Sequence, residues 1–306
     1  MSREQGAWTG LRFALGMLTV LPAGRVEVDR RVAGRGMAAA PLIGALVGVL
    51  AAVAYTVSTH LFGAGLLPAV LTLATLALLT RALHLDGLAD LADGLGSGKP
   101  PEGALTVMRR SDIGPFGVVT LCLVLLLQGA ALLATAVGAV ALITACVSGR
   151  LAITLACRRG VPAARPEGLG ALVAGSVGPW AAIGTAVLSL GGLAFLGLMS
   201  DLCWLGPFSP PWSGVSANDL EPGLLYIDPS PGLLDGLPFP VEGLERTPGP
   251  FPLMLVLPVA ALAGLAAAWA VGRRAVNRLG GVTGDVLGAL VEVTATAALL
   301  VCAALT

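Results

Sequence analysis

Long apolar stretches dominate the chain. Seven of them approach the roughly 20 residues that a helix needs to cross the hydrocarbon core of a bilayer. They cover residues 37–60, 66–84, 115–135, 137–156, 179–199, 251–272 and 285–306. The apolar sequence from Phe116 to Cys157 is too long for one helix, which predicts a hairpin that turns near Gly138. The pattern predicts one all-α domain over residues 1–306, a polytopic membrane bundle of about seven transmembrane helices.

Basic residues gather on one side of this alternating arrangement. They lie before the first apolar stretch and in or beside every second loop after it, which are the loops on one side of the membrane. Arg246 alone falls in a loop on the other side. Because Lys and Arg in short loops are retained in the cytoplasm, the N-terminus is predicted to be cytoplasmic and the C-terminus external. The short apolar segment from Phe13 to Pro22 is predicted to be an interfacial helix rather than a cleaved leader.

The segment 200–250 differs in character from the rest of the chain. It is rich in proline, glycine and acidic residues, and Arg246 is its single arginine. We expect an external loop with little regular structure. A tolerated surface insertion is the favoured interpretation, and a lid or partner-binding segment is the alternative.

Composition supports a membrane protein. Hydrophobic residues make up 56% of the chain and charged residues 12%, and the mean hydropathy is +0.88, which excludes an ordinary soluble domain. The five cysteines follow no disulfide or metal-binding spacing. The lipid bilayer is the expected surrounding, and no nucleic-acid partner is expected.

Three aspartates recur at the end of the second apolar stretch, at positions 86, 90 and 93. In an α-helix, residues four and seven positions apart lie within an arc of roughly 60°, so the carboxylates of Asp86, Asp90 and Asp93 would share one face. A carboxylate at the bilayer centre costs about 2.5 to 3.5 kcal/mol, and like charges at this spacing repel each other. We therefore expect the cluster to lie near water, on the cytoplasmic side, and to bind Mg²⁺.

Two arginines follow in the same predicted loop. Paired guanidinium donors match phosphate oxygens, so Arg109, Arg110, Ser111 and Asp112 are candidate substrate-binding residues in a phosphate clamp. The alternative is that the arginines only anchor the loop on the cytoplasmic side. The neighbouring aspartates favour phosphate binding.

A glycine-rich sequence opens the last apolar stretch. Gly280, Gly281, Thr283 and Gly284 are candidate substrate-binding residues, because glycines allow the backbone to approach a ligand closely. Asp285 starts the predicted helix and could complete the metal site. An ordinary helix cap is the competing interpretation of Asp285.

Two further ionisable residues are candidates. Glu292 lies seven residues after Asp285, hence about 10 Å deeper on nearly the same face, and is expected to face the bundle interior. It is assigned to substrate binding. His84 precedes the aspartates and could orient a carboxylate, receive a proton or make polar contacts only.

The ordered motifs resemble the cobalamin synthase family, whose members are also called adenosylcobinamide-GDP ribazoletransferases. The likeness runs along the whole chain except the segment 200–250, and the exchanged order of Arg110 and Asp112 departs from the family pattern. The motifs are His84-Leu85-Asp86-Gly87-Leu88-Ala89-Asp90 with Asp93-Gly94, Met108, Ile113-Gly114-x-Phe116-Gly117, Gly168-Leu169-Gly170, and Gly280-Gly281-x-Thr283-Gly284-Asp285 with Gly288-Ala289 and Glu292.

The resemblance implies an enzyme of late cobalamin biosynthesis that assembles the nucleotide loop. Such an enzyme transfers adenosylcobinamide phosphate from its GDP-activated form to α-ribazole, or α-ribazole 5′-phosphate, and releases GMP with Mg²⁺ as cofactor. It is a multi-pass protein of the bacterial inner membrane with a cytoplasmic active site, and homo-oligomers or complexes with other corrinoid-assembly enzymes are compatible with it.

The resemblance also assigns roles to residues. Asp86, Asp90, Asp93 and Asp285 would hold the metal ion against the diphosphate. Arg109 and Arg110 would offset charge on the departing GMP, while His84 or an aspartate would take the ribazole hydroxyl proton.

Three alternatives remain from the residues alone. Another Mg²⁺-dependent membrane enzyme similar to CDP-alcohol phosphotransferases would use a related carboxylate motif, which Asp86-Gly87-x-Ala89-Asp90 matches only in part. A cation-coupled transporter could carry the same acids along its pathway. A non-catalytic scaffold of the assembly machinery would explain neither the aspartate spacing nor the glycines.

Overall fold

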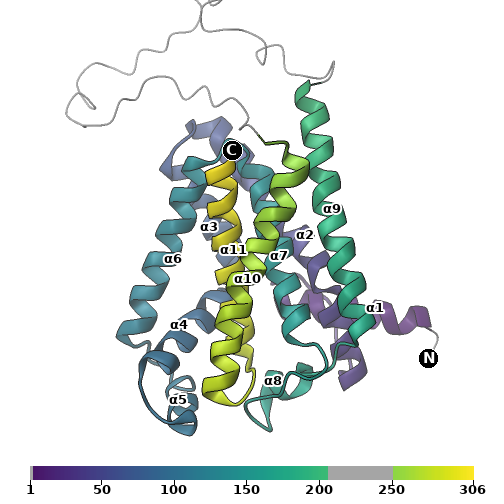
Figure 1. Cartoon of the computed structure of the whole chain (residues 1–306), viewed down its shortest axis with the longest axis vertical. Helices are drawn as coiled ribbons and strands as arrows, with labels where there is room; N and C mark the ends of the chain where they lie inside the picture. Colours follow the sequence, from purple (N-terminus) through teal and green to yellow (C-terminus); the bar gives the residue numbers. More distant parts are fainter. Residues whose placement is uncertain (1–2, 206–250) are drawn as a thin grey trace, which may run out of the picture.

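A computed structural model describes residues 3–205 and 251–306 of the chain. Within these residues the elements are all helices, joined by loops that hold two isolated β-bridges. Figure 1 shows them as an upright bundle with one helix lying across it. The helices are α1 (Arg3–Leu18), α2 (Arg30–Phe62), α3 (Leu66–Leu79), α4 (Leu83–Gly96), α5 (Pro101–Val107), α6 (Pro115–Ala134), α7 (Gly138–Ala156), α8 (Gly168–Val173), α9 (Pro179–Leu205), α10 (Leu253–Leu279) and α11 (Gly284–Leu305).

The helices match the predicted membrane bundle. Six described helices are long and apolar enough to cross a membrane, namely α2, α6, α7, α9, α10 and α11, and the pair α3 and α4 raises the number to seven if it counts as one span. The hairpin near Gly138 is confirmed, because α6 ends at Ala134 and α7 begins at Gly138. The all-α polytopic fold is therefore confirmed.

The predicted span 66–84 is wrong as a single straight helix. The chain bends by 90° between α3 and α4, and Arg81 and Ala82 both have left-handed backbone angles, with φ of 54° and 52°. The amide of Ala82 donates to the carbonyl of Ala77 at 2.7 Å, which closes the end of α3. The Arg81 guanidinium donates to carbonyls of Gly16 and Met17 in α1, so a tertiary contact holds a conformation that non-glycine residues disfavour.

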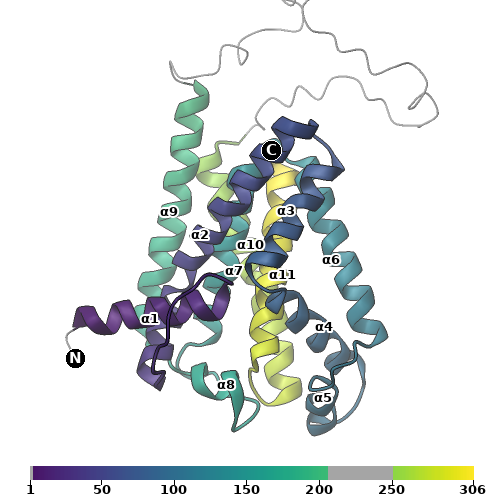
Figure 2. The same cartoon turned by 180° about the vertical axis from the view of Figure 1, so that it is seen from behind.

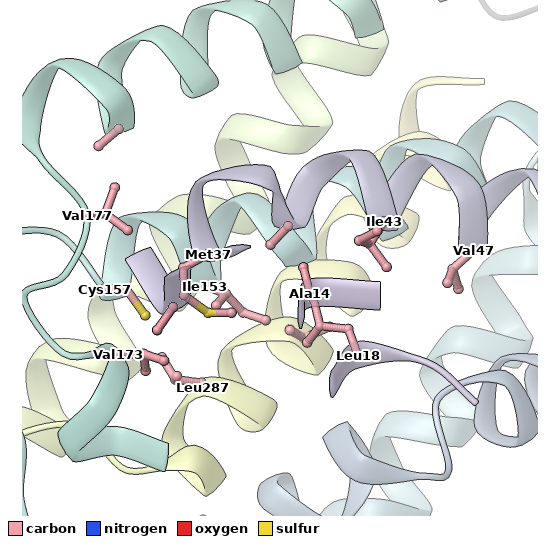
Figure 3. Packing of buried hydrophobic residues seen from close by; sticks show 14 of the residues in the cluster. Ala14, Leu18, Met37, Ile43, Val47, Ile153, Cys157, Val173, Val177 and Leu287 are labelled. Atoms are coloured by element: carbon pink, nitrogen blue, oxygen red, sulfur yellow. The ribbon is translucent and has the colours of Figure 1, made fainter. Parts of the chain in front are cut away.

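The interfacial helix α1 is longer than the sequence suggested, starting ten residues before Phe13. Figures 1 and 2 show it crossing the side of the bundle rather than running along it. Its buried residues Ala14 and Leu18 belong to a core cluster with α2, α7 and α11, part of which appears in Figure 3. Burial of this apolar face fixes α1 against the bundle.

The backbones of α2 and α7 approach each other closely. A Cβ atom on Gly48 would lie 2.8 Å from the Cα of Ile143, and one on Gly44 would meet the backbone of Cys146 and Val147. Small residues at such positions let membrane helices pack by van der Waals contact. Gly44 and Gly48 therefore let α2 pack closely against α7.

The predicted external loop begins later than residue 200, because α9 continues to Leu205. The Asp201 carboxylate accepts hydrogen bonds from the amides of Leu253 and Met254 at 3.0 and 3.1 Å. It therefore caps the start of α10, where amides have no partner inside the helix. Residues 206–250 lie outside the described part of the chain, so the loop prediction is not tested.

The motif-bearing segments share one end of the bundle. In Figure 1, α4, α5, α8 and the turn between α10 and α11 all lie at the lower end, whereas the C-terminus lies at the upper end. The fold thus collects the aspartates, the arginine loop and the glycine-rich turn on one side. That this side is cytoplasmic stays a prediction.

Candidate active site

The site forms where α4 crosses α11. A Cβ atom on Gly87 would lie 2.7 Å from the carbonyl oxygen and 2.9 Å from the Cα of Asp285. One turn further along α11, a Cβ atom on Gly288 would lie 3.2 Å from the Cα of His84. The backbones of the two helices therefore touch, and this contact brings the aspartates of both helices together.

Negative charge is concentrated at this crossing. Asp90 interacts electrostatically with Asp86, Asp285 and Asp93, and Arg165 is the cation that partly offsets them. Asp285 likewise interacts with Asp86 and Arg165. Several carboxylates with one arginine leave an excess of negative charge, which a bound cation would relieve.

Arg165 is the functional candidate that the sequence reasoning missed. It belongs to the loop between α7 and α8, and its guanidinium donates to the carbonyl of Leu105 in α5 at 2.6 Å. Burial and the nearby Arg109 lower the pKa of Arg165, while Asp285 and Asp90 raise it. An arginine in a short Pro- and Gly-rich loop was the available signal, but nothing in the sequence places this loop beside α4.

The four predicted clamp residues are exposed in the loop between α5 and α6. Arg109 is close enough to Arg165 for the two charges to interact. Two neighbouring guanidinium groups beside carboxylates suit an anion that also binds a metal ion. The substrate contacts of Arg110, Ser111 and Asp112 stay predictions.

Asp93 is engaged differently from the other two aspartates of α4. Its side chain is buried, and its two carboxylate oxygens accept hydrogen bonds from the amides of Gly114 and Gly117 at 2.7 and 2.9 Å. These amides lie at the start of α6, where the helix dipole and unpaired donors favour a negative charge. Asp93 therefore ties α4 to α6, and its predicted catalytic and metal-binding roles stay predictions.

Replacing Asp93 by alanine is expected to destabilise the protein by about 2 to 4 kcal/mol, because the buried amide of Gly117 and the partly buried amide of Gly114 lose a charged acceptor. A thermal melt of the purified protein in detergent would show a lower midpoint. Glu102→Ala removes an exposed carboxylate from α5 and serves as the control. An unchanged melt for Asp93→Ala would contradict the capping role.

The glycine-rich turn before α11 packs against protein. Gly280 ends α10 with φ of 81°, and a Cβ atom on Gly281 would meet the backbone of residues 162–164. Val282 exchanges backbone hydrogen bonds with Pro162 and Ala164 at 2.9 and 3.1 Å. The turn thus fixes the Arg165 loop beside α11, and direct substrate contacts of Gly280 and Gly281 stay predictions.

Thr283, rather than Asp285, is the N-cap of α11. Its hydroxyl oxygen accepts from the amide of Val286 at 3.2 Å, and the hydroxyl donates to the Asp285 carboxylate at 3.2 Å. The capping interpretation of Asp285 is therefore wrong. Its carboxylate lies in the first turn beside Asp86 and Asp90.

A second polar group lies deeper in the bundle. Gln128 of α6 donates to the Glu292 carboxylate at 2.9 Å and to the Thr296 hydroxyl at 3.0 Å. Glu292, His84 and the buried Arg150 line one small cavity of about 40 Å³. The prediction that Glu292 faces the bundle interior is confirmed, whereas its substrate contact stays a prediction.

The donor atoms at the crossing fit a hard cation. The described residues contain no group of three or more His, Cys, Asp or Glu side chains close enough to hold a metal ion by themselves. Mg²⁺ commonly uses one or two carboxylates and completes its shell with water and substrate phosphates. One or two of the carboxylates of Asp86, Asp90 and Asp285 would be enough for such a partly hydrated ion, and Mg²⁺ binding at this crossing stays a prediction.

Comparison with known proteins decides the family. The family model described as cobalamin-5-phosphate synthase matches residues 10–303. The chain belongs to the cobalamin-5-phosphate synthase family. Membership makes it an enzyme, a transferase of late cobalamin biosynthesis, and disfavours the transporter and scaffold alternatives.

Relatives support this family along most of the chain. An adenosylcobinamide-GDP ribazoletransferase from Frankia casuarinae is 40% identical over 95% of this chain and 93% of the relative. Another from Bradyrhizobium diazoefficiens is 42% identical over 62% of this chain and 76% of the relative, and one from Corynebacterium efficiens is 29% identical over 96% and 90%. No solved structure matches significantly. The family's sequence pattern therefore extends over the helices that build the crossing.

Proposed function

We propose that this enzyme joins GDP-activated adenosylcobinamide to α-ribazole, or to α-ribazole 5′-phosphate, and releases GMP. The observation that carries the proposal is the meeting of Asp86, Asp90 and Asp285 at the α4–α11 crossing, beside Arg165. Phosphoryl transfer requires that the negative charge of the diphosphate be neutralised. A cation held by the carboxylates and the positive charges of the arginines would provide this neutralisation. The names of the relatives supply the substrates.

The reaction balances as a substitution at phosphorus. A ribose hydroxyl oxygen forms a bond to the phosphorus on the corrinoid side, the bond from this phosphorus to the bridging oxygen breaks, and GMP leaves. The hydroxyl proton passes to a base, for which His84 and the aspartates of α4 are the candidates. Bound Mg²⁺ would neutralise the diphosphate and lower the energy of the leaving group.

The protein's own residues divide this work. Asp86, Asp90 and Asp285 would hold the cation and fix the diphosphate beside it. Arg165 and Arg109, whose charges interact, would bind the phosphate that leaves with GMP. The basic residues in the loops at this end of the bundle support an active site on the cytoplasmic face of the plasma membrane.

Release of GMP tests the proposal directly. Purified protein in lipid nanodiscs is incubated with the GDP-activated corrinoid, with and without α-ribazole and with Mg²⁺ or an excess of EDTA. We expect GMP and a corrinoid product of matching mass only when both substrates and Mg²⁺ are present. Absence of GMP under these conditions would refute the transferase, and undiminished release in EDTA would refute the metal.

A further inference from the structure

A cavity of about 210 Å³ opens beside the α4–α11 crossing. Its polar wall holds His84, Asp86 and Asp285, and its apolar wall comes from α1, α7, α8 and α11. Leu18, Ile153 and Leu287 of this apolar wall belong to the core cluster drawn in Figure 3. The cavity therefore joins a hydrophobic interior to the carboxylates of the active site.

We propose that this cavity binds the base of the nucleoside substrate, α-ribazole. The assignment rests on the proposed function. The base of α-ribazole is a dimethylated benzimidazole, a flat apolar bicyclic ring that gains free energy by leaving water. The attached ribose is polar and would lie at the mouth, beside Asp86 and Asp285.

Size separates the two substrates. Pockets for drug-sized ligands measure roughly 300 to 1,000 Å³, so a cavity of about 210 Å³ suits a fragment such as one bicyclic base. The corrinoid is a macrocycle with several amide side chains and is far larger. Burying those amides among Leu18, Ile153 and Leu287 without partners would also be costly.

The position of the cavity fits the reaction geometry. Asp86 and Asp285 line the cavity, whereas Asp90 and Arg165 do not, and Arg165 interacts with Asp90 and Asp285 outside it. Displacement at phosphorus places the attacking and leaving oxygens roughly in line. A nucleoside held in the cavity would attack from the Asp86 side, and GMP would depart toward Arg165.

His84 gives an independent indication of a ligand. It lines both this cavity and the 40 Å³ cavity beside Glu292, its side chain is 2% exposed, and its Nε2 atom has no hydrogen-bond partner in the described part of the chain. An unpaired buried ring nitrogen costs free energy that a bound polar group would recover. A hydroxyl of a nucleoside that displaces a neighbouring side chain and reaches this ring is such a group.

Two tryptophan substitutions in α8 test whether the cavity binds the base of α-ribazole. Leu169→Trp would fill part of the cavity, and we expect the KM for α-ribazole to rise at least tenfold while the KM for the GDP-activated corrinoid stays unchanged. Leu172→Trp is the matched control, because Leu172 lies on the same short helix with similar partial exposure but does not line the cavity. Binding of labelled α-ribazole without corrinoid, measured in nanodiscs, should weaken in Leu169→Trp only.

A second variant guards against misfolding. Met17→Trp narrows the same cavity from α1 and should reproduce the selective rise in KM. If both folded variants keep the wild-type KM and affinity for α-ribazole, the cavity assignment is overturned while the transferase stands. If the wild-type protein releases no GMP, the proposed function fails and the assignment fails with it.

Discussion

Replacing Asp86 or Asp90 by asparagine is expected to lower the rate of GMP release at least about 100-fold, while the protein still folds and reaches the membrane. Both residues have the size and shape of asparagine, so packing of α4 against α11 is preserved. What changes is the charge, because each carboxylate contributes to the negative cluster at the crossing. GMP release at saturating substrate measures the effect.

The control for these variants is Glu102→Gln, which removes an exposed carboxylate of α5. It should leave turnover unchanged. Thermal melts should show that Asp86→Asn and Asp90→Asn are at least as stable as the wild type, because each substitution relieves repulsion among like charges. Wild-type turnover in either variant would show that the substituted aspartate is not a ligand of the metal ion.

Replacing Gly87 by alanine should lower turnover at least about tenfold and also lower the melting temperature. The added methyl group would lie 2.7 Å from the carbonyl oxygen of Asp285, closer than carbon atoms approach backbone in proteins, so α4 and α11 must move apart. Overpacking of this kind costs about 1 to 3 kcal/mol. Displacement of catalytic groups by about 1 Å can cost about 100-fold in rate.

Gly191→Ala is the matched control for Gly87→Ala. Gly191 lies within α9, and no atom outside the adjoining backbone of its own helix lies within 4 Å of the place where its Cβ would be. Alanine in a helix is otherwise more favourable than glycine by about 0.5 to 1 kcal/mol, so this variant should be neutral or slightly more stable. Equal behaviour of the two variants would show that the crossing tolerates a wider separation than the structure indicates.

The Gly87→Ala variant and the two aspartate variants together separate the effect of helix geometry from the effect of charge. Asparagine at position 86 or 90 keeps the helix contact and changes the ligand atoms. Alanine at position 87 keeps every ligand atom and changes the distance between the helices. Loss of activity in both, with loss of stability only in Gly87→Ala, would show that α4 and α11 form one site.

The pattern of apolar and acidic residues along the chain was enough to predict the membrane helices, one hairpin and part of the carboxylate cluster. Apolar stretches located the membrane helices, the excess length from Phe116 to Cys157 predicted the hairpin at Gly138, and the spacing of Asp86 and Asp90 placed two carboxylates on one helix face. These features depend on the lengths and periodicities of single helices. A sequence displays such features directly, because the length of an apolar run and the helical period of its side chains are properties of one segment.

The tertiary structure decided which groups meet. The bend at Arg81 depends on carbonyls of α1, Asp93 is held by the start of α6, and Arg165 reaches the aspartates only because Val282 pairs with Pro162. Each contact joins segments far apart in the chain. Their register is set by close packing at glycines such as Gly87, and no single helix carries the information about its neighbour's position.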